Sequence, residues 1–217
     1  MDDRDRAAAL GQLDVSRETV ERLDAFVALL RRWQGVRNLV GRSTLGTIWS
    51  RHIVDSAQLL DHVPAQAREL TDLGAGAGFP GLVLAILLRG RPGLRVTLIE
   101  SDQRKAAFLR AAARELDLPV RVRAERIEVA LGDPPECDVV TARALAPLGD
   151  LLTLAAPLID RGALGLFPKG ENVADELTAS RAADRFRIEL RSSRTRAGAV
   201  IVIVRRNEPP PSAGQQE

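Results

Sequence analysis

Apolar residues in the first part of the chain repeat at the spacing of an amphipathic helix. They recur three or four positions apart behind Ser16, a residue type that caps helix N-termini well. The stripe consists of Val20, Leu23, Val27 and Leu30. This pattern predicts a helix from residue 16 to about residue 33, which the sequence GVRN then breaks. A second helical segment is expected over roughly residues 45–62.

From about residue 67 the pattern changes to short apolar runs that alternate with helical stretches. The runs ELTDLG, RVTLIE, VRVRAERI, CDVVTARA and GALGLFPKG each hold a strand. Such alternation predicts an α/β fold, a mainly parallel sheet with helices on both faces. Two successive strands, RFRIELRSS and AVIVIVRR, predict a hairpin that adds an antiparallel edge strand. We expect an N-terminal helical extension over 1–66, the sheet domain over 67–206, and a disordered tail over 207–217.

Composition is that of an ordinary globular protein. The chain has 217 residues, of which 45% are hydrophobic and 28% charged, and no apolar run approaches the length of a membrane span. Its N-terminus lacks the apolar core of a secretory signal. A single cysteine excludes an internal disulfide, and two histidines argue against a zinc site. We therefore expect a cytoplasmic protein without a metal and, because no extra apolar helix face is left over, a monomer.

The net charge of +2 hides an uneven distribution of arginine. Residues 31–51 contain five arginines and no acidic residue, and residues 185–206 contain seven arginines with Glu189 as their one acidic residue. Such clusters either bind the phosphates of a nucleic acid or form solvated faces, and both interpretations stay open. Aromatic residues make up only 3% of the chain, which argues against an extended base-stacking platform.

The stretch LTDLGAGAGFPGL, residues 70–82, joins the first predicted strand to the following helix. It satisfies the pattern G-x-G-x-x-G from Gly76 to Gly81 and an acidic-x-G-x-G-x-G pattern from Asp72 to Gly78. In the NAD fingerprint the first glycine makes the turn directly after the strand. Here the turn begins at Gly74, so the G-x-G-x-x-G match is out of register with its strand.

Charge separates the two interpretations of the loop further. Asp72 at the end of the strand would repel a diphosphate and suits a cationic ligand such as S-adenosylmethionine. Glu100 ends the second strand, where a carboxylate accepts hydrogen bonds from ribose hydroxyls in either case. The loop thus favours a methyltransferase over an NAD-dependent oxidoreductase, which stays open as an alternative.

The loop and several other blocks of the chain resemble the RsmG (GidB) family, the 16S ribosomal RNA guanine-N7 methyltransferases. The matching blocks are TDLGAGAGFPGLVLAI, NLVGRSTLGTIWSRHIVDSAQLL, LIESDQRKAAFLRAAARELDL, VRAERIE, CDVVTARALAPLGDLL and FPKG. The similarity extends from about residue 20 to residue 204. It implies a class I (Rossmann-like) methyltransferase fold, S-adenosyl-L-methionine as cofactor with S-adenosyl-L-homocysteine as product, and 16S rRNA of the small ribosomal subunit as partner.

The resemblance also implies roles for individual residues. The expected cofactor-binding residues are Asp72, Gly74, Gly76, Gly78, Phe79, Glu100, Ala124, Glu125 and Arg143. Gly74 and Phe79 would line the methionine and adenosyl end of the pocket. Ala124 and Glu125 would face the adenine, and Arg143 would lie over the site. Two positions depart from the commoner family pattern: Glu100 stands where relatives often have aspartate, and Pro168 replaces leucine.

Methylation of guanine N7 requires no general base, because the N7 lone pair is exposed in the major groove as an acceptor. The protein then has to align the reacting atoms and to supply donors to guanine O6. The candidate substrate-positioning residues are Asn38, Arg51, His52, Asp55, Arg143 and Lys169. Other roles stay open: a helix cap for Asn38, an i,i+4 ion pair between Arg51 and Asp55, and a core position for His52. A non-catalytic RNA-binding protein with a vestigial pocket is the third functional alternative.

Overall fold

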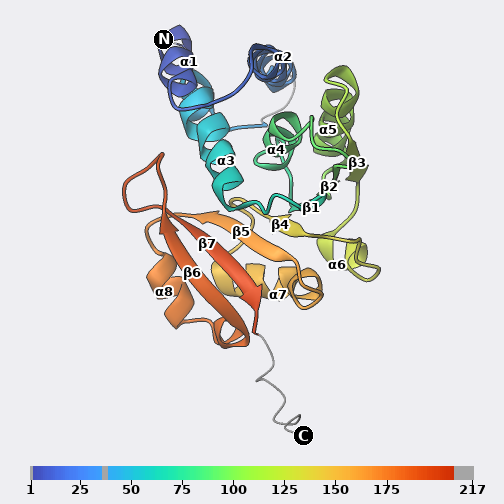
Figure 1. The fold of residues 1–217 in the computed structure, drawn as a ribbon, viewed down its shortest axis with the longest axis vertical. Helices are drawn as coiled ribbons and strands as arrows, with labels where there is room; N and C mark the ends of the chain where they lie inside the picture. Colours follow the sequence, from blue (N-terminus) through green and yellow to red (C-terminus); the bar gives the residue numbers. More distant parts are fainter. Residues whose placement is uncertain (1, 36–38, 208–217) are drawn as a thin grey trace, which may run out of the picture.

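The computed structural model describes residues 2–35 and 39–207, which form a sheet covered by helices on both faces (Figure 1). The strand order is β3-β2-β1-β4-β5-β7-β6. The strands are β1 (Glu69–Leu73), β2 (Arg95–Ile99), β3 (Val120–Arg123), β4 (Val139–Thr141), β5 (Leu164–Lys169), β6 (Phe186–Ser192) and β7 (Val200–Arg206). Strands β1 to β5 are parallel, which confirms the predicted α/β fold.

The C-terminal hairpin confirms the predicted antiparallel edge and adds the order of its two strands. Strand β7, which is antiparallel to both of its neighbours, pairs with β5 and lies inside the sheet, and β6 forms the edge. The physical reason is apolar character: residues 201–204 of β7 are all buried, whereas β6 carries exposed Arg187 and Arg191. A strand that is apolar on both faces is stabilised between two others, and a charged strand tolerates the edge.

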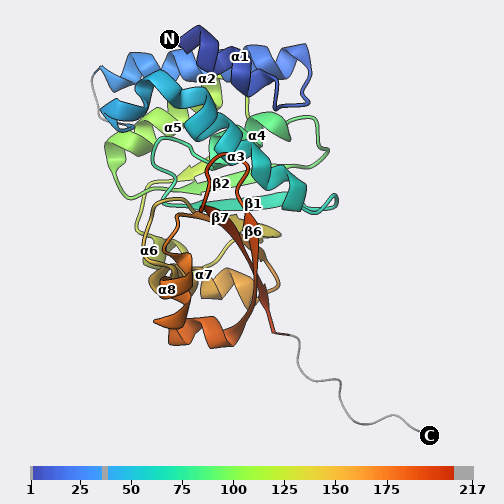
Figure 2. The same ribbon diagram turned by 90° about the vertical axis from the view of Figure 1, so that its left-hand side faces the viewer.

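Helices from the N-terminal part of the chain cover one face of the sheet, and α6 to α8 cover the other (Figure 2). The α-helices are α1 (Asp2–Leu10), α2 (Arg17–Gln34), α3 (Asp55–Ala57), α4 (Gly81–Leu87), α5 (Gln103–Glu115), α6 (Ile127–Ala130), α7 (Leu148–Ile159) and α8 (Val173–Thr178). The side chains of successive strand residues alternate between two buried clusters. On β2, for example, Leu98 packs toward α2, α4 and α5, and Ile99 toward α7.

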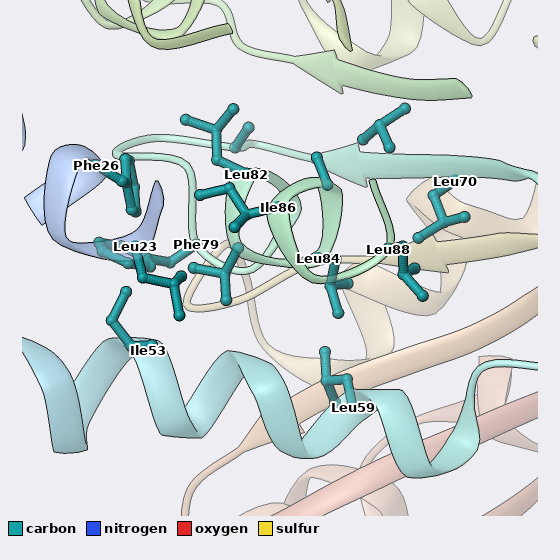
Figure 3. Close-up of a cluster of buried hydrophobic side chains, with 14 of the residues drawn as sticks. Leu23, Phe26, Ile53, Leu59, Leu70, Phe79, Leu82, Leu84, Ile86 and Leu88 are labelled. Carbon is teal, nitrogen blue, oxygen red and sulfur yellow. The ribbon is translucent and has the colours of Figure 1, made fainter. Parts of the chain in front are cut away.

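The N-terminal helices share the core of the sheet domain. Phe26 of α2 packs edge-on against Phe79, with ring centroids 5.4 Å apart, and also contacts Phe108 of α5. Figure 3 shows Phe26, Leu23 and Ile53 gathered around Phe79. These buried contacts fix the position of the N-terminal helices relative to the loops at the carboxyl ends of the strands.

The predicted helix after Ser16 is confirmed, since the Ser16 hydroxyl accepts a hydrogen bond from the Thr19 amide at 3.3 Å. Helix α1 was missed because its sequence is polar and buries little more than Ala9. The segment expected over 45–62 is a continuous helical run from Arg42 to His62 that changes its hydrogen-bonding pattern along its length. Residues Trp49–Val54 form π-helical turns, a geometry that is frequent at functional sites.

Some predictions fall outside the residues that the structure describes, namely the disordered tail, apart from Asn207, and the role of Asn38. Across residues 2–35 and 39–207, no helix is both long and apolar enough to cross a membrane. The same residues contain no group of histidine, cysteine and acidic side chains arranged to hold a metal ion.

Candidate active site

The candidate site lies at the carboxyl ends of the parallel strands, where the chain changes direction across the sheet. Strand β1 lies between β2 and β4, so the loops after these three strands meet at one edge. In doubly wound sheets this switch point is where ligands bind. The loops begin at Gly74, Glu100 and Ala142, and each contains residues named in the sequence analysis.

The glycine loop between β1 and α4 depends on glycine for two different reasons. Gly74 has a φ of +65°, and a Cβ there would lie 2.6 Å from Leu145 Cδ1. Gly81, the last residue of the FPG sequence, opens α4, where a Cβ would lie 2.4 Å from Leu98 Cδ2 and 2.7 Å from the Asp72 carboxylate. Only glycine allows this turn and this close approach of the helix to the sheet.

Asp72 lies beneath the glycine loop and faces away from the open site. Its side chain is only 1% exposed, and its two oxygens accept hydrogen bonds from the Gly81 amide at 3.0 Å and the Thr141 hydroxyl at 2.8 Å. Burial raises the pKa of this carboxyl from 3.8 to about 7, against the opposing effect of the hydrogen bonds. Asp72 therefore anchors the start of α4, and its role as a cofactor-binding residue stays a prediction.

Glu100 ties the loop after β2 to the glycine loop. One carboxylate oxygen accepts a hydrogen bond from the Gly76 amide and the other from the Asp102 amide, both at 2.8 Å. The side chain is 7% exposed and lines the cavity above the loop. Because each carboxylate oxygen has a second lone pair, the predicted bond to ribose hydroxyls is compatible with this geometry.

A cavity of ≈ 460 Å³ opens over these loops. It is lined by Leu39, Gly74, Gly76, Ile99, Glu100, Ser101, Lys105, Arg126, Ile127, Glu128, Arg143, Ala144, Leu145 and Leu154. Four of the predicted cofactor-binding residues are in this lining, namely Gly74, Gly76, Glu100 and Arg143. The other five are Asp72, Gly78, Phe79, Ala124 and Glu125. Gly78 is buried within the glycine loop, where its amide donates to the Ala75 carbonyl at 2.7 Å.

Phe79 points into the hydrophobic core, and so it does not line the cavity. The side chain is 5% exposed, and its ring stacks on the His52 imidazole with centroids 4.8 Å apart. The Arg143 guanidinium carbon lies 5.3 Å from the centre of the same ring. Phe79 therefore supports the side chains of His52 and Arg143, and its expected contact with the cofactor stays a prediction.

Ala124 and Glu125 also lie beside the cavity. The Ala124 carbonyl accepts a hydrogen bond from the Gln103 side chain at 2.9 Å, and Glu125 pairs with Arg123 at 2.6 Å. The loop after β3 contributes its next residues to the cavity instead, at positions 126–128. The expected contacts of Ala124 and Glu125 with the adenine stay predictions. Sequence reasoning overlooked Lys105, although this is one of only two lysines in an arginine-rich chain.

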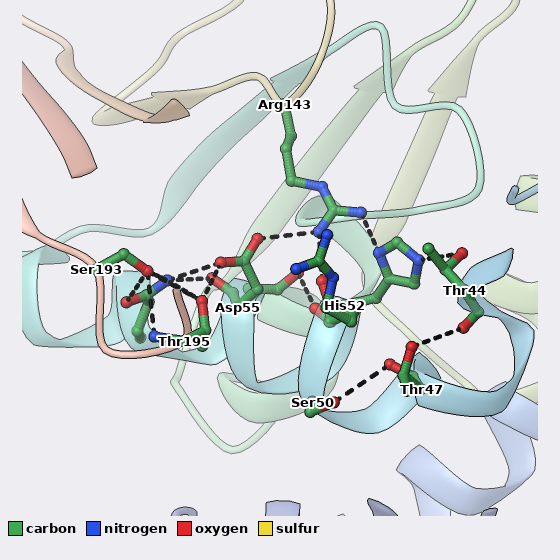
Figure 4. A network of polar contacts seen from close by, with 11 residues as sticks. Thr44, Thr47, Ser50, His52, Asp55, Arg143, Ser193 and Thr195 are labelled. Carbon is green, nitrogen blue, oxygen red and sulfur yellow. Dashed lines mark hydrogen bonds and ion pairs between the residues drawn. The ribbon is translucent and has the colours of Figure 1, made fainter. Parts of the chain in front are cut away.

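Arg143, in the loop after β4, sits at the centre of a polar network (Figure 4). Its Nη1 donates to the Asp55 carboxylate at 3.0 Å and to the Arg51 carbonyl at 3.2 Å, and its Nη2 donates to His52 Nδ1. The side chain is 17% exposed. The structure does not show the alternative ion pair between Arg51 and Asp55, because the Asp55 carboxylate pairs with Arg143 instead.

His52 is a neutral imidazole in this network. A guanidinium can only donate, so Nδ1 must accept and Nε2 carries the proton, which points to the Thr44 hydroxyl 3.1 Å away. Burial, followed by the positive charges of Arg143 and Arg51, lowers the pKa of His52 to about 3. The structure is compatible with both interpretations that the sequence offered for His52. Its ring packs on Phe79, as a core position requires, and it also lines an open cavity, as a substrate-positioning role requires.

A second cavity, of ≈ 260 Å³, lies on the other side of Arg143. The helical run, the loop after β4, the end of β5 and the loop between β6 and β7 enclose it, and they bring together Arg51, His52, Asp55, Arg143 and Lys169. Arg51 is exposed, and the described residues offer its guanidinium no hydrogen-bond or ion-pair partner. The Lys169 ammonium pairs with Glu176 at 2.6 Å and donates to the Ala146 carbonyl.

Thr44 and Thr195, which also line the second cavity, carried no signal in the sequence. Thr195 lies 140 positions from its partner Asp55, so only the folded chain brings the two together. The geometry thus joins two adjacent cavities at the same edge of the sheet, with the Arg143 side chain shared between their walls.

Comparison with known proteins gives a consistent result. Residues 19–197 match the family model for rRNA small subunit methyltransferase G, or GidB. The "Ribosomal RNA small subunit methyltransferase G" of Methylobacterium radiotolerans is 54% identical over 204 residues, which cover 94% of this chain and 96% of the relative. The protein of the same name from Cereibacter sphaeroides is 50% identical over 90% of this chain and 94% of its own length.

Solved structures show the same fold at low sequence identity. A methyltransferase from Geobacter sulfurreducens has a TM-score of 0.58 at 18% identity, covering 95% of this chain and 98% of its own. A mutant of MtNAS in complex with S-adenosylmethionine has a TM-score of 0.55 at 18% identity, covering 85% of this chain and 74% of its own. The predicted class I methyltransferase fold is thereby confirmed.

Proposed function

Because the chain belongs to the rRNA small subunit methyltransferase G family, we propose that it transfers a methyl group from S-adenosylmethionine to N7 of a guanosine in 16S ribosomal RNA. The observation that carries this proposal is the family match over residues 19–197, which includes every residue that lines the first cavity and all but Ala199 and Val200 of the second. Family membership also decides against the NAD-dependent oxidoreductase considered from the sequence.

The ≈ 460 Å³ cavity fits an adenosyl cofactor in its chemistry. Glu100 presents a carboxylate at the rim, and Gly74 and Gly76 leave the backbone open beside it. Ile99, Ile127 and Leu145 supply apolar surface of the kind that an adenine ring packs against. When bound, S-adenosylmethionine would supply a methyl group already activated by its positively charged sulfur.

The side chains between the two cavities are suited to position a substrate and unsuited to move protons. The pKa of His52 is about 3, so its imidazole is neutral at physiological pH, and the Asp55 carboxylate is held in an ion pair with Arg143. Guanine N7 needs no general base, so this site matches the proposed reaction. We therefore assign His52 and Asp55, together with Asn38 and Lys169, to substrate positioning.

Arg143 has donors left for the substrate. A guanidinium carries five N–H groups. The hydrogen bonds that Arg143 makes to Asp55, Arg51 and His52 use both hydrogens of Nη1 and one of Nη2, which leaves the Nε hydrogen and one Nη2 hydrogen. We propose that these donate to guanine O6 or to a phosphate of the target nucleotide, where they offset negative charge and fix the ring.

The second cavity is the side from which RNA would enter. Arg51, Arg143, Lys169 and Arg196 line it. The last three pair with Asp55, Glu176 and Glu171 respectively, so Arg51 is the cation that we expect to meet a phosphate of the RNA. We place the reaction in the cytoplasm, where ribosomal subunits are, and we propose that the enzyme acts as a monomer.

The test is to map modified nucleotides of 16S rRNA by mass spectrometry in cells with and without this protein. We expect one N7-methylguanosine to be lost in its absence and restored by the wild-type chain. An Arg143→Ala variant should restore little of it, whereas the exposed Arg110→Ala on α5 should restore it fully. An unchanged modification map would contradict the proposal and would favour a protein that binds RNA without methylating it.

A further inference from the structure

The loop between β6 and β7 is tied to the helical run through one buried side chain. Gln58 is 2% exposed, and its oxygen accepts a hydrogen bond from the Arg194 amide at 2.9 Å. Its amide nitrogen donates to Ser193 Oγ at 3.1 Å and to Asp55 Oδ1 at 2.9 Å. The loop is therefore held at a fixed position beside Asp55.

Thr195 completes this arrangement from within the loop. Its hydroxyl donates to Asp55 Oδ1 at 2.7 Å, so this oxygen is held by donors from Thr195 and Gln58. The other oxygen, Oδ2, is the one that accepts the bond from Arg143. Figure 4 shows the chain of contacts running from Ser193 and Thr195 through Asp55 to Arg143.

We propose that Thr195, supported by Gln58, is a positioning residue that holds Arg143 between the two cavities by fixing the orientation of the Asp55 carboxylate. The terminal torsion of aspartate is broad and only weakly constrained by its own preferences. Two donors on Oδ1 remove that freedom and direct Oδ2 at the Arg143 guanidinium. The hairpin loop, far from the cofactor loops in sequence, thereby contributes to the geometry of the site.

The consequence for catalysis rests on the proposed function, since it requires Arg143 to act on the substrate. Arg143 packs on Phe79 and bonds to His52, so its guanidinium has one well-defined plane. Loss of the Asp55 anchor would let the guanidinium leave this plane without unfolding the core. The hydrogen bonds that tie Glu100 to the glycine loop involve neither Arg143 nor Asp55, so this part of the cofactor cavity would keep its shape.

The first experiment uses the NMR signals of the His52 imidazole to detect whether Arg143 still bonds to it, and it needs neither RNA nor cofactor. The chain has two histidines, so ¹⁵N NMR of labelled imidazoles resolves both, and a His62→Gln variant assigns them. In the wild type, His52 should stay neutral with Nδ1 as acceptor. In Thr195→Val and Thr195→Ala, we expect the His52 signals to change and the ring to titrate at higher pH, because Arg143 no longer faces it.

Two matched variants show whether the effect comes from the Thr195 hydroxyl positioning Asp55 and Arg143 or from a general disturbance of the loop between β6 and β7. Thr195→Ser keeps the hydroxyl and should restore the wild-type His52 signals. Ser193→Ala breaks the hydrogen bonds of Ser193 to Gln58 and within the loop but leaves the bond between Thr195 and Asp55, and it should also resemble the wild type. The proposal is overturned if Thr195→Val and Thr195→Ala leave His52 unchanged, or if Ser193→Ala perturbs it equally.

The second experiment measures methyl transfer to small ribosomal subunits. We expect Thr195→Val to lower kcat/KM for the RNA substrate about tenfold, the size expected for one hydrogen bond to a charged group. Affinity for S-adenosylhomocysteine should fall less than kcat/KM, because Glu100, Gly74 and Gly76 keep their positions, and Thr195→Ser should restore activity. If the protein proves not to methylate RNA, the proposed function fails, but the NMR result still decides whether Thr195 positions Arg143.

Discussion

Asp72→Asn is the substitution that tests the glycine loop most sharply, because it removes a charge without removing the loop's anchor. The wild-type carboxylate accepts bonds from the Gly81 amide and the Thr141 hydroxyl. An asparagine can accept from Gly81 through its oxygen and donate to Thr141 through its nitrogen, since a hydroxyl serves in either role. Both contacts therefore survive in the variant, and the charge alone is lost.

The magnitude follows from the pKa of Asp72, which burial raises from 3.8 to about 7. The folded pKa lies above the unfolded value, so the folded state binds the extra proton between these two values. Stability consequently falls as pH rises through this window, and the loss is complete above about pH 7. At 1.36 kcal/mol per unit, the total cost of the charged form is of order 4 kcal/mol.

The assay is urea unfolding of wild type and Asp72→Asn in steps from about pH 5 to about pH 8. Over this range we expect the variant to gain about 3 kcal/mol in unfolding free energy relative to the wild type, with most of the change below about pH 7. Asp133→Asn, in an exposed turn, is the matched control and should show no such trend. A difference between wild type and Asp72→Asn that does not vary with pH would refute the argument from burial.

Three further predictions follow from the site. Gly74→Ala should lose about 1–3 kcal/mol of unfolding free energy, because the φ of residue 74 is positive and a Cβ there would meet the Leu145 side chain. Calorimetry should also show that this variant loses much of its affinity for S-adenosylhomocysteine. Gly90→Ala is the control, since a Cβ there meets open space, and it should lose neither. Phe79→Ala should lower the unfolding free energy in urea by about 3–5 kcal/mol, the cost of a buried phenylalanine, and a loss under 1 kcal/mol would contradict its core position. Arg51→Ala should reduce the salt dependence of RNA binding by about one unit of logarithmic slope in a filter-binding titration, and an unchanged slope would mean that Arg51 meets no phosphate.

The fold was predictable because its signals are local. The apolar periodicity predicted that strands β1 to β5 alternate with helices, and the glycine turn at Gly74 predicted that a ligand binds at the carboxyl ends of these strands. The polar helix α1 escaped because periodicity detects a helix only through an apolar stripe. The order of the last two strands also required knowledge of which strand is buried on both faces.

The candidate site was predictable by loop but only partly by residue. Gly74 and Glu100 were found because each directly follows a strand, and Arg143 was found through the family resemblance. The direction of a side chain is decided by packing, which is why the Phe79 ring lies in the core. Contacts between distant segments, such as Thr195 with its carboxylate partner, leave no trace in a single sequence.

The central claim is tested most directly by the purified protein and its proposed substrate. Small ribosomal subunits from cells that lack this protein would be incubated with S-adenosylmethionine carrying a deuterated methyl group, and the 16S rRNA would then be mapped by mass spectrometry. We predict one labelled guanosine, with the label on N7. Label on another atom or base, or no label in RNA when the protein binds S-adenosylhomocysteine normally, would contradict this account.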